Sequence, residues 1–78
     1  MALYFFHLCD GGDTLLDAEG REIADLALIP AMTLKDARGM ISADALEGRL
    51  DLSAFIQVRD NSGTLVHELA FRDAITIR

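Results

Sequence analysis

The chain has 78 residues, of which 51% are hydrophobic and 26% charged, and its formal net charge is −6 at pH 7. This length fits a single small domain, residues 1–78, and the composition is that of a globular chain rather than a disordered one. The net negative charge opposes binding to nucleic acids and to anionic membrane surfaces, because proteins bind both through clustered lysine and arginine. We therefore expect neither as a partner.

The single cysteine, Cys9, cannot form an internal disulfide, and no paired-cysteine spacing suggests structural zinc. The first nine residues are apolar, but they lack the basic start and the cleavage site of a secretion signal. No apolar run approaches the ~18 residues of a membrane span. These features predict a cytoplasmic protein.

The segment from Ala2 to Leu8 is rich in aromatic and apolar residues and predicts a strand. Side chains alternate along a strand, so the two faces of this one hold Tyr4, Phe6 and Leu8, and Leu3, Phe5, His7 and Cys9. Both faces are largely apolar. Either the second face is covered, or it is a contact surface.

Residues 10–13, Asp-Gly-Gly-Asp, predict a turn, and residues 14–16 a short returning strand. A second turn is expected at residues 18–21, followed by Ile23 as a core anchor. Residues 10–25 contain six acids and one base, a net charge of −5. The simplest interpretation of this stretch is a solvated loop that keeps a small protein soluble.

A helix distorted near Pro30 is predicted for residues 26–47, with Asp25 as its N-cap and Gly48 as its stop. In an alternative, Thr33 and Asp36 form a later cap pair and the regular helix begins only near residue 33. The apolar stripe of the longer helix has helical spacing and consists of Leu26, Ile29, Leu34, Ala37, Ile41 and Ala45.

Residues 54–59 alternate, with Ile56 and Val58 on one face, and predict a half-buried strand. Residues 60–63 form a turn signal, and residues 64–71 form the partner strand of a second hairpin. This strand places Leu65, His67, Leu69 and Phe71 on one face, and residues 75–77 either extend the sheet or pack against it.

The order hairpin, helix, hairpin predicts an α+β fold with an antiparallel sheet of about four strands and one helix packed on one face. Neither hairpin could bury its apolar face without the other elements.

Several short segments resemble a family of short bacterial proteins known only as a domain of unknown function. The most specific are the opening Tyr4-Phe5-Phe6-His7-Leu8 and the closing Phe71-Arg72-Asp73-Ala74, and the resemblance covers nearly the whole chain. It implies a bacterial cytoplasmic protein and a compact α+β unit, and it transfers no catalytic role. Cys9 departs from the arginine common at this position in the family, which argues against a shared nucleophile or ligand there. Pro30 is a second departure.

A metal or thiolate site is one hypothesis, because His7 and Cys9 share a face of their strand, as His67 would if the first and last strands pair. A catalytic Cys9–His7 dyad is disfavoured, since side chains two apart on a strand lie ~6–7 Å apart. The acidic residues 10–25 do not have the spacing of a calcium loop, and Gly11-Gly12 lacks the context of a phosphate loop. No cofactor and no catalytic residue are therefore expected.

The leading hypothesis is a non-enzymatic interaction or accessory module with a protein partner or a second copy of itself. Tyr4, Phe5 and Phe6 form the expected contact surface, and the chain could form a homodimer through its first strand. The alternatives are a metal-binding or thiol-dependent protein using His7, Cys9 and His67, and an acidic decoy that binds a basic partner through residues 10–25.

Overall fold

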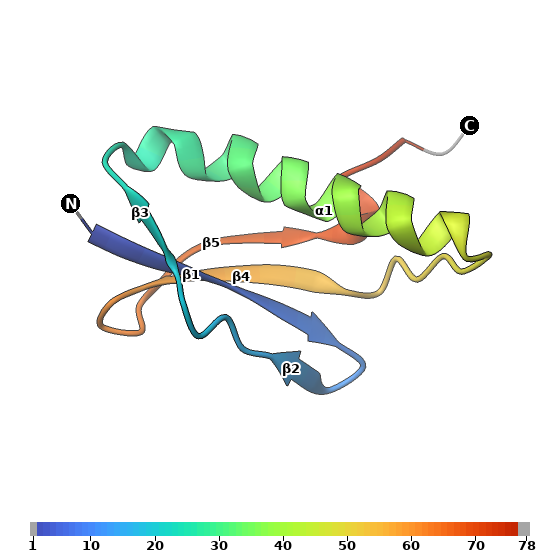
Figure 1. The fold of residues 1–78 in the computed structure, drawn as a ribbon, viewed down its shortest axis with the longest axis horizontal. Helices are drawn as coiled ribbons and strands as arrows, with labels where there is room; N and C mark the ends of the chain where they lie inside the picture. Colours follow the sequence, from blue (N-terminus) through green and yellow to red (C-terminus); the bar gives the residue numbers. More distant parts are fainter. Residues whose placement is uncertain (1, 77–78) are drawn as a thin grey trace.

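The computed structural model describes residues 2–76 and shows an antiparallel sheet with one long helix on one face (Figure 1). The sheet has five strands, with β2, β1, β4 and β5 in spatial order and β3 also paired with β1. This arrangement confirms the predicted α+β class. The elements, in chain order, are β1 (Ala2–Asp10), β2 (Asp13–Leu15), β3 (Arg21–Ile23), a 3₁₀ turn (Leu26–Leu28), α1 (Ile29–Leu46), β4 (Phe55–Asp60), β5 (Leu65–Ala70) and a second 3₁₀ turn (Phe71–Asp73).

Strand β1 organises the sheet, because it pairs with three other strands. One of its edges pairs with β4, from Tyr4 opposite Asp60 to Cys9 opposite Phe55. The other edge is shared: β2 pairs with the end of β1 and β3 with its beginning. The first strand therefore lies beside β4, and the last strand, β5, lies beyond β4.

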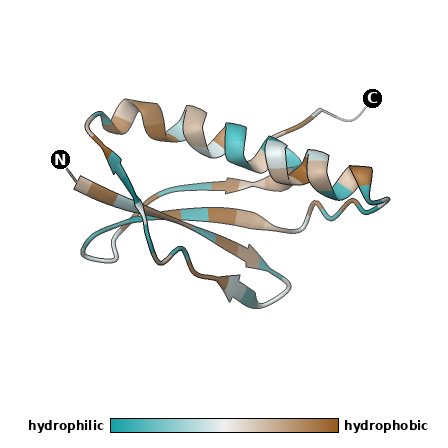
Figure 2. Ribbon diagram, in the orientation of Figure 1, coloured by the Kyte–Doolittle hydropathy of each residue, from teal (hydrophilic) through white to brown (hydrophobic). Residues whose placement is uncertain are grey.

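Helix α1 buries one side chain per turn against the sheet: Ile29, Thr33, Ala37 and Ile41. The sheet side of this core is centred on β4, where Ile56 and Val58 are 1% and 0% exposed, as their alternation predicts. Figure 2 shows apolar residues along β1 and β4 and hydrophilic ones on β3 and in the loop after α1. The core thus lies in one layer between the helix and the sheet.

The start of the helix resolves the question raised by Pro30. Asp25 caps the 3₁₀ turn by accepting a hydrogen bond from the amide of Ala27 at 2.9 Å, and α1 follows directly from Ile29. Pro30 therefore lies in the first turn of α1, where its missing N–H needs no partner. Leu26 does not belong to the buried stripe, since it is 56% exposed.

The alternative start near residue 33 is wrong. Thr33 is fully buried inside α1, and its hydroxyl donates to the carbonyl of Ile29 at 2.7 Å. Asp36 pairs with Arg21 instead of contributing to a cap.

The predicted end of the helix is confirmed. Gly48 has a φ of +81°, and its amide donates to the carbonyl of Ala45. The left-handed conformation that glycine adopts easily stops the helix at this point.

The second hairpin is also confirmed, with one local difference. Its turn is closed by the amide of Gly63, which donates to the carbonyl of Asp60. The register shifts after Val58, so that Leu65 lies opposite Arg59. Leu65 is therefore not on the same face as His67 and Leu69, and it is 44% exposed. Phe71 is buried in the second 3₁₀ turn, and Ile75 packs against the core, while Ile77 lies outside the described residues.

The second face of β1 is partly covered by the loop between β2 and β3. Gly20 in this loop has a φ of +74° and lies against the ring of Phe5, so that a Cβ here would be 2.9 Å from Phe5 Cε2. Only glycine adopts this conformation at little cost and leaves room for the ring.

We expect Gly20→Ala to destabilise the protein by about 1–3 kcal/mol, because it adds left-handed backbone strain and displaces the Phe5 ring. Gly12→Ala is the matched control, since Gly12 also has positive φ but open space around it. Gly39→Ala, in an exposed turn of α1 with open space, should instead stabilise by about 0.5–1 kcal/mol. Urea unfolding of the three variants measures these differences, and an equal effect at Gly20 and Gly12 would contradict the contact with Phe5.

Candidate functional site

An open groove lies on the helix-facing side of the sheet, between α1 and the first hairpin. Helix α1 packs against β4 and β5, so it leaves the adjoining part of β1 and β2 uncovered. The groove has a volume of about 420 Å³. We call it the hairpin groove; its lining residues are Phe6, Leu8, Leu15, Leu16, Asp17, Glu19, Gly20, Arg21 and Met40.

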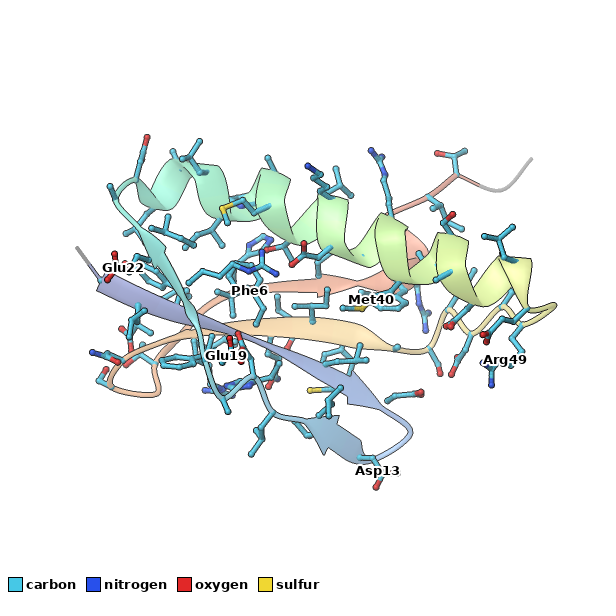
Figure 3. All side chains as sticks on the ribbon, in the orientation of Figure 1. Phe6, Asp13, Glu19, Glu22, Met40 and Arg49 are labelled. Atoms are coloured by element: carbon cyan, nitrogen blue, oxygen red, sulfur yellow. The ribbon has the colours of Figure 1, made fainter. Side chains whose placement is uncertain are left out.

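The floor of the hairpin groove is apolar, whereas Asp17, Glu19 and Arg21 make its loop side polar. Phe6 and Leu8 alternate along β1 and form the floor, and Met40 projects from α1 (Figure 3). The opposite wall contains Leu15 and Leu16, which are 71% and 69% exposed. Adjacent leucines this exposed, beside an apolar floor, form an apolar patch rather than scattered surface residues.

Asp17 holds the loop between β2 and β3 in place. Its carboxylate accepts hydrogen bonds from the amides of Phe6 at 3.1 Å, Gly20 at 3.1 Å and Glu19 at 3.2 Å. The amide of Asp17 donates to Nδ1 of His7 at 3.0 Å. The Phe6 amide belongs to the β1 edge between β2 and β3, so the carboxylate replaces a strand partner there.

The pKa of Asp17 reflects these contacts. Partial burial acts to raise the pKa, but the amides of Gly20, Phe6 and Glu19, with the charge of Arg21, outweigh it and hold the pKa below its usual value. Asp17 is therefore bound to the loop in its ionised form.

Arg21 closes one end of the hairpin groove. Its guanidinium lies 4.3 Å from the centre of the Phe6 ring and pairs with Asp36 of α1 at 2.5 Å. This contact connects β3 to α1 and stacks a cation on an aromatic face, an interaction that is favourable in its own right. The positive charge of Arg21 is thus already matched by the chain itself.

A second hollow of about 220 Å³ adjoins the hairpin groove along α1. We call it the acidic hollow, because three aspartates line it. The pKa of Asp10 is raised by a hydrogen bond with Asp51 and by the charge of that carboxylate, whereas bonds from Ser53 lower the pKa of Asp51. The lining residues of the acidic hollow are Leu8, Asp10, Met40, Ala43, Asp44, Asp51, Ala54 and Phe71, and none of them is basic.

The three aromatic residues predicted as a contact surface do not lie on one face. Tyr4 is 8% exposed and belongs to the core, and Phe6 lies on the floor of the hairpin groove. Phe5 points to the opposite face of the sheet, where its ring stacks on His7 with 6.3 Å between ring centres. Tyr4 is therefore not available for contact, and the two phenylalanines belong to different surfaces.

His7, Cys9 and His67 do not converge. His67 lies opposite Val58 and so on the helix-facing side, whereas His7 and Cys9 lie on the other side of the sheet. The hypothesis required β1 to pair with β5, but β4 separates these strands. Cys9 is buried, and its sulfur accepts a weak hydrogen bond from the Thr14 hydroxyl at 3.8 Å. Among residues 2–76, no group of three or more histidine, cysteine or acidic side chains could hold a metal ion.

The sequence interpretation missed the hairpin groove. One available signal was the pair Leu15-Leu16, because neighbouring side chains on a strand cannot both face one core. A second was the spacing of Asp17, Glu19 and Gly20, which suits a carboxylate that bonds to amides two and three residues later. The bond from Asp17 to Phe6 spans eleven residues and has no local signal.

Residues 3–72 match the family described as a domain of unknown function (DUF6894), so the chain belongs to this family. The match spans both hairpins and the helix and confirms the resemblance drawn from the sequence. No curated protein and no solved structure matches the chain. Within the described residues, no helix is both long and apolar enough to cross a membrane.

We expect Asp17→Asn to reduce stability by about 1–2 kcal/mol at pH 7, since a neutral amide replaces a carboxylate that accepts three backbone hydrogen bonds. The folded pKa of Asp17 lies below its ordinary value of 3.8, so its contribution is complete above that pH and is lost as the pH falls through the folded pKa. The loss of stability that Asp17→Asn causes relative to the wild type should therefore become smaller below about pH 4. Urea unfolding at several pH values measures this loss of stability, and Asp73→Asn, at an exposed position, is the control. A loss of stability that does not change with pH would contradict the role of the Asp17 charge.

Proposed function

We propose that this DUF6894 protein is a non-enzymatic interaction module that binds a protein partner in the hairpin groove. The observation that carries the proposal is the wall formed by Leu15 and Leu16, 71% and 69% exposed, beside the apolar floor. Covering these side chains would remove apolar surface from water, which favours association. A location in the bacterial cytoplasm, implied by the family resemblance, is part of the same proposal.

Two of the three charged side chains in the hairpin groove are bonded to other groups of the chain, which supports binding over catalysis. Asp17 is bound to three backbone amides, and Arg21 is paired with Asp36. These groups therefore serve the structure of the groove. A general acid or base would instead need to be free to reach a substrate proton.

We expect the double variant Leu15→Ser with Leu16→Ser to keep the wild-type fold and to lose its partner. The two leucines are exposed, so their replacement removes little buried surface from the folded protein. Co-purification from the native cell, quantified by mass spectrometry, measures partner capture, and circular dichroism checks the fold.

Leu46→Ser is the matched control, because Leu46 is 87% exposed and does not line the groove. The control should retain every partner that the wild type captures. If the double variant captures the same partners at the same level as the control, the proposed function is wrong.

Self-association through the first strand is a second candidate, favoured by the face of β1 opposite to α1. Phe5 and His7 stack there with ring planes only 8° apart, and both are half-buried within one chain. A second copy placed on this face would cover both rings.

For this second candidate, we expect light scattering to show a mass that rises with protein concentration for the wild type but not for Phe5→Ser. Tyr4→Ser is unsuitable as a partner variant, because Tyr4 belongs to the core and its loss would destabilise the fold. A wild type that remains monomeric at every concentration would contradict self-association through this strand.

A further inference from the structure

The hairpin groove and the acidic hollow lie side by side along α1, and together we call them the channel. They share two lining residues, Leu8 of β1 and Met40 of α1. On the helix, Met40, Ala43 and Asp44 line this channel at spacings of three and four residues, which places them on one helical face. The lining residues of α1 therefore cover about one turn of the helix.

Charge is distributed unevenly along the channel. Its middle is apolar, with Leu8 and Met40 on its surface. Acidic side chains lie at both ends: Asp17 and Glu19 at the hairpin groove, and Asp10, Asp44 and Asp51 at the acidic hollow. Arg21, the one basic lining residue, is paired with Asp36, which leaves the channel with a negative potential.

The carboxyl groups of Asp10, Asp44 and Asp51 line the acidic hollow, and no basic side chain does. A hydrogen bond with Asp51, and then the charge of its carboxylate, raise the pKa of Asp10. A cationic side chain placed in the acidic hollow would be attracted to these carboxyl groups and would form charge-assisted hydrogen bonds with them. A phosphate or a nucleic acid would be repelled by the same groups.

The walls of the channel also restrict the backbone of an occupant. On the α1 side they consist of side chains, such as that of Met40, because the backbone groups of a helix bond to one another, whereas Gly20 lines the opposite side with backbone atoms. A helix satisfies its own backbone hydrogen bonds and can bury an apolar face in such a groove.

We propose that the occupant of this channel is a basic amphipathic helix of a protein partner. Its apolar side chains rest on Phe6, Leu8 and Met40, and its lysine or arginine side chains reach Asp44 and Asp51. This inference rests on the proposed function and adds the chemical class of the partner to it.

Fluorescence anisotropy with three labelled synthetic peptides tests the inference on the full chain. The first peptide has leucines at helical spacing and lysines on the other face. The second has glutamate in place of each lysine, and the third has the composition of the first with its leucines distributed around the helix. We expect the first to bind at least about tenfold more tightly than either of the others, and to weaken as salt is added.

Variants locate the binding site. The double variant Asp44→Asn with Asp51→Asn should weaken binding of the first peptide and reduce its dependence on salt, because both carboxylates are exposed to the channel. Leu16→Ser should weaken binding of the same peptide without removing its salt dependence. Asp73→Asn, which changes an exposed aspartate outside the channel, should leave binding unchanged.

The outcomes separate this inference from the proposed function. Equal binding of the lysine and glutamate peptides, with loss in Leu16→Ser, would overturn the basic partner and leave the apolar groove in place. Equal binding of the first and third peptides would overturn the amphipathic helix. Binding of none of the peptides would overturn the whole inference, whereas the proposed function is decided separately by partner capture with the leucine variants.

Discussion

The hydrogen bond between the Asp17 carboxylate and the Phe6 amide determines the shape of this protein's candidate binding surface. Strands β2 and β3 share one edge of β1. On this edge β3 pairs as far as Tyr4 and β2 begins to pair at Leu8, so Phe6 lies between them with no strand partner on this side. The carboxylate fills this position. The loop of residues 16–20 therefore stays close to β1 while Leu16 points outward, and Arg21 is brought within reach of α1.

The same loop decides how the two faces of β1 are covered. On the helix-facing side it forms the wall of the hairpin groove, and on the other side Gly20 lies against Phe5. A strand with two apolar faces thus needs no second layer over the whole sheet. One face is shared between the core and the groove, and the other is shielded in part by a loop and by the stacking of Phe5 on His7.

The sequence predicts most of the fold because most of its signals are local. Alternation identifies β4, the Asp-Gly and Asn-Ser-Gly turns identify both hairpins, and Gly48 identifies the end of α1. Strand neighbours are not local, since nothing within β1 indicates that it pairs with β4 rather than β5. For this reason the convergence of His7, Cys9 and His67 was a reasonable hypothesis from sequence and is not found in the structure.

The candidate site was less predictable than the fold. Asp17 looks like one of several solvated acids in residues 10–25, and only the folded chain brings it to Phe6. The acidic hollow combines Asp10, Asp44 and Asp51 from three separate segments, so its charge has no counterpart in the sequence pattern. The acidic character of residues 10–25, assigned first to solubility, contributes in the structure to the negative end of the channel.

These observations lead to one central claim, that the channel beside α1 is the binding surface of the molecule. NMR spectra of methyl-labelled protein, recorded while the basic amphipathic peptide is added, test it most directly. The account predicts shifts of the methyl signals of Leu8, Leu16 and Met40, with the signal of Leu46 unchanged. Shifts confined to residues on the opposite face of the sheet, such as Leu3 and Ala70, would contradict it.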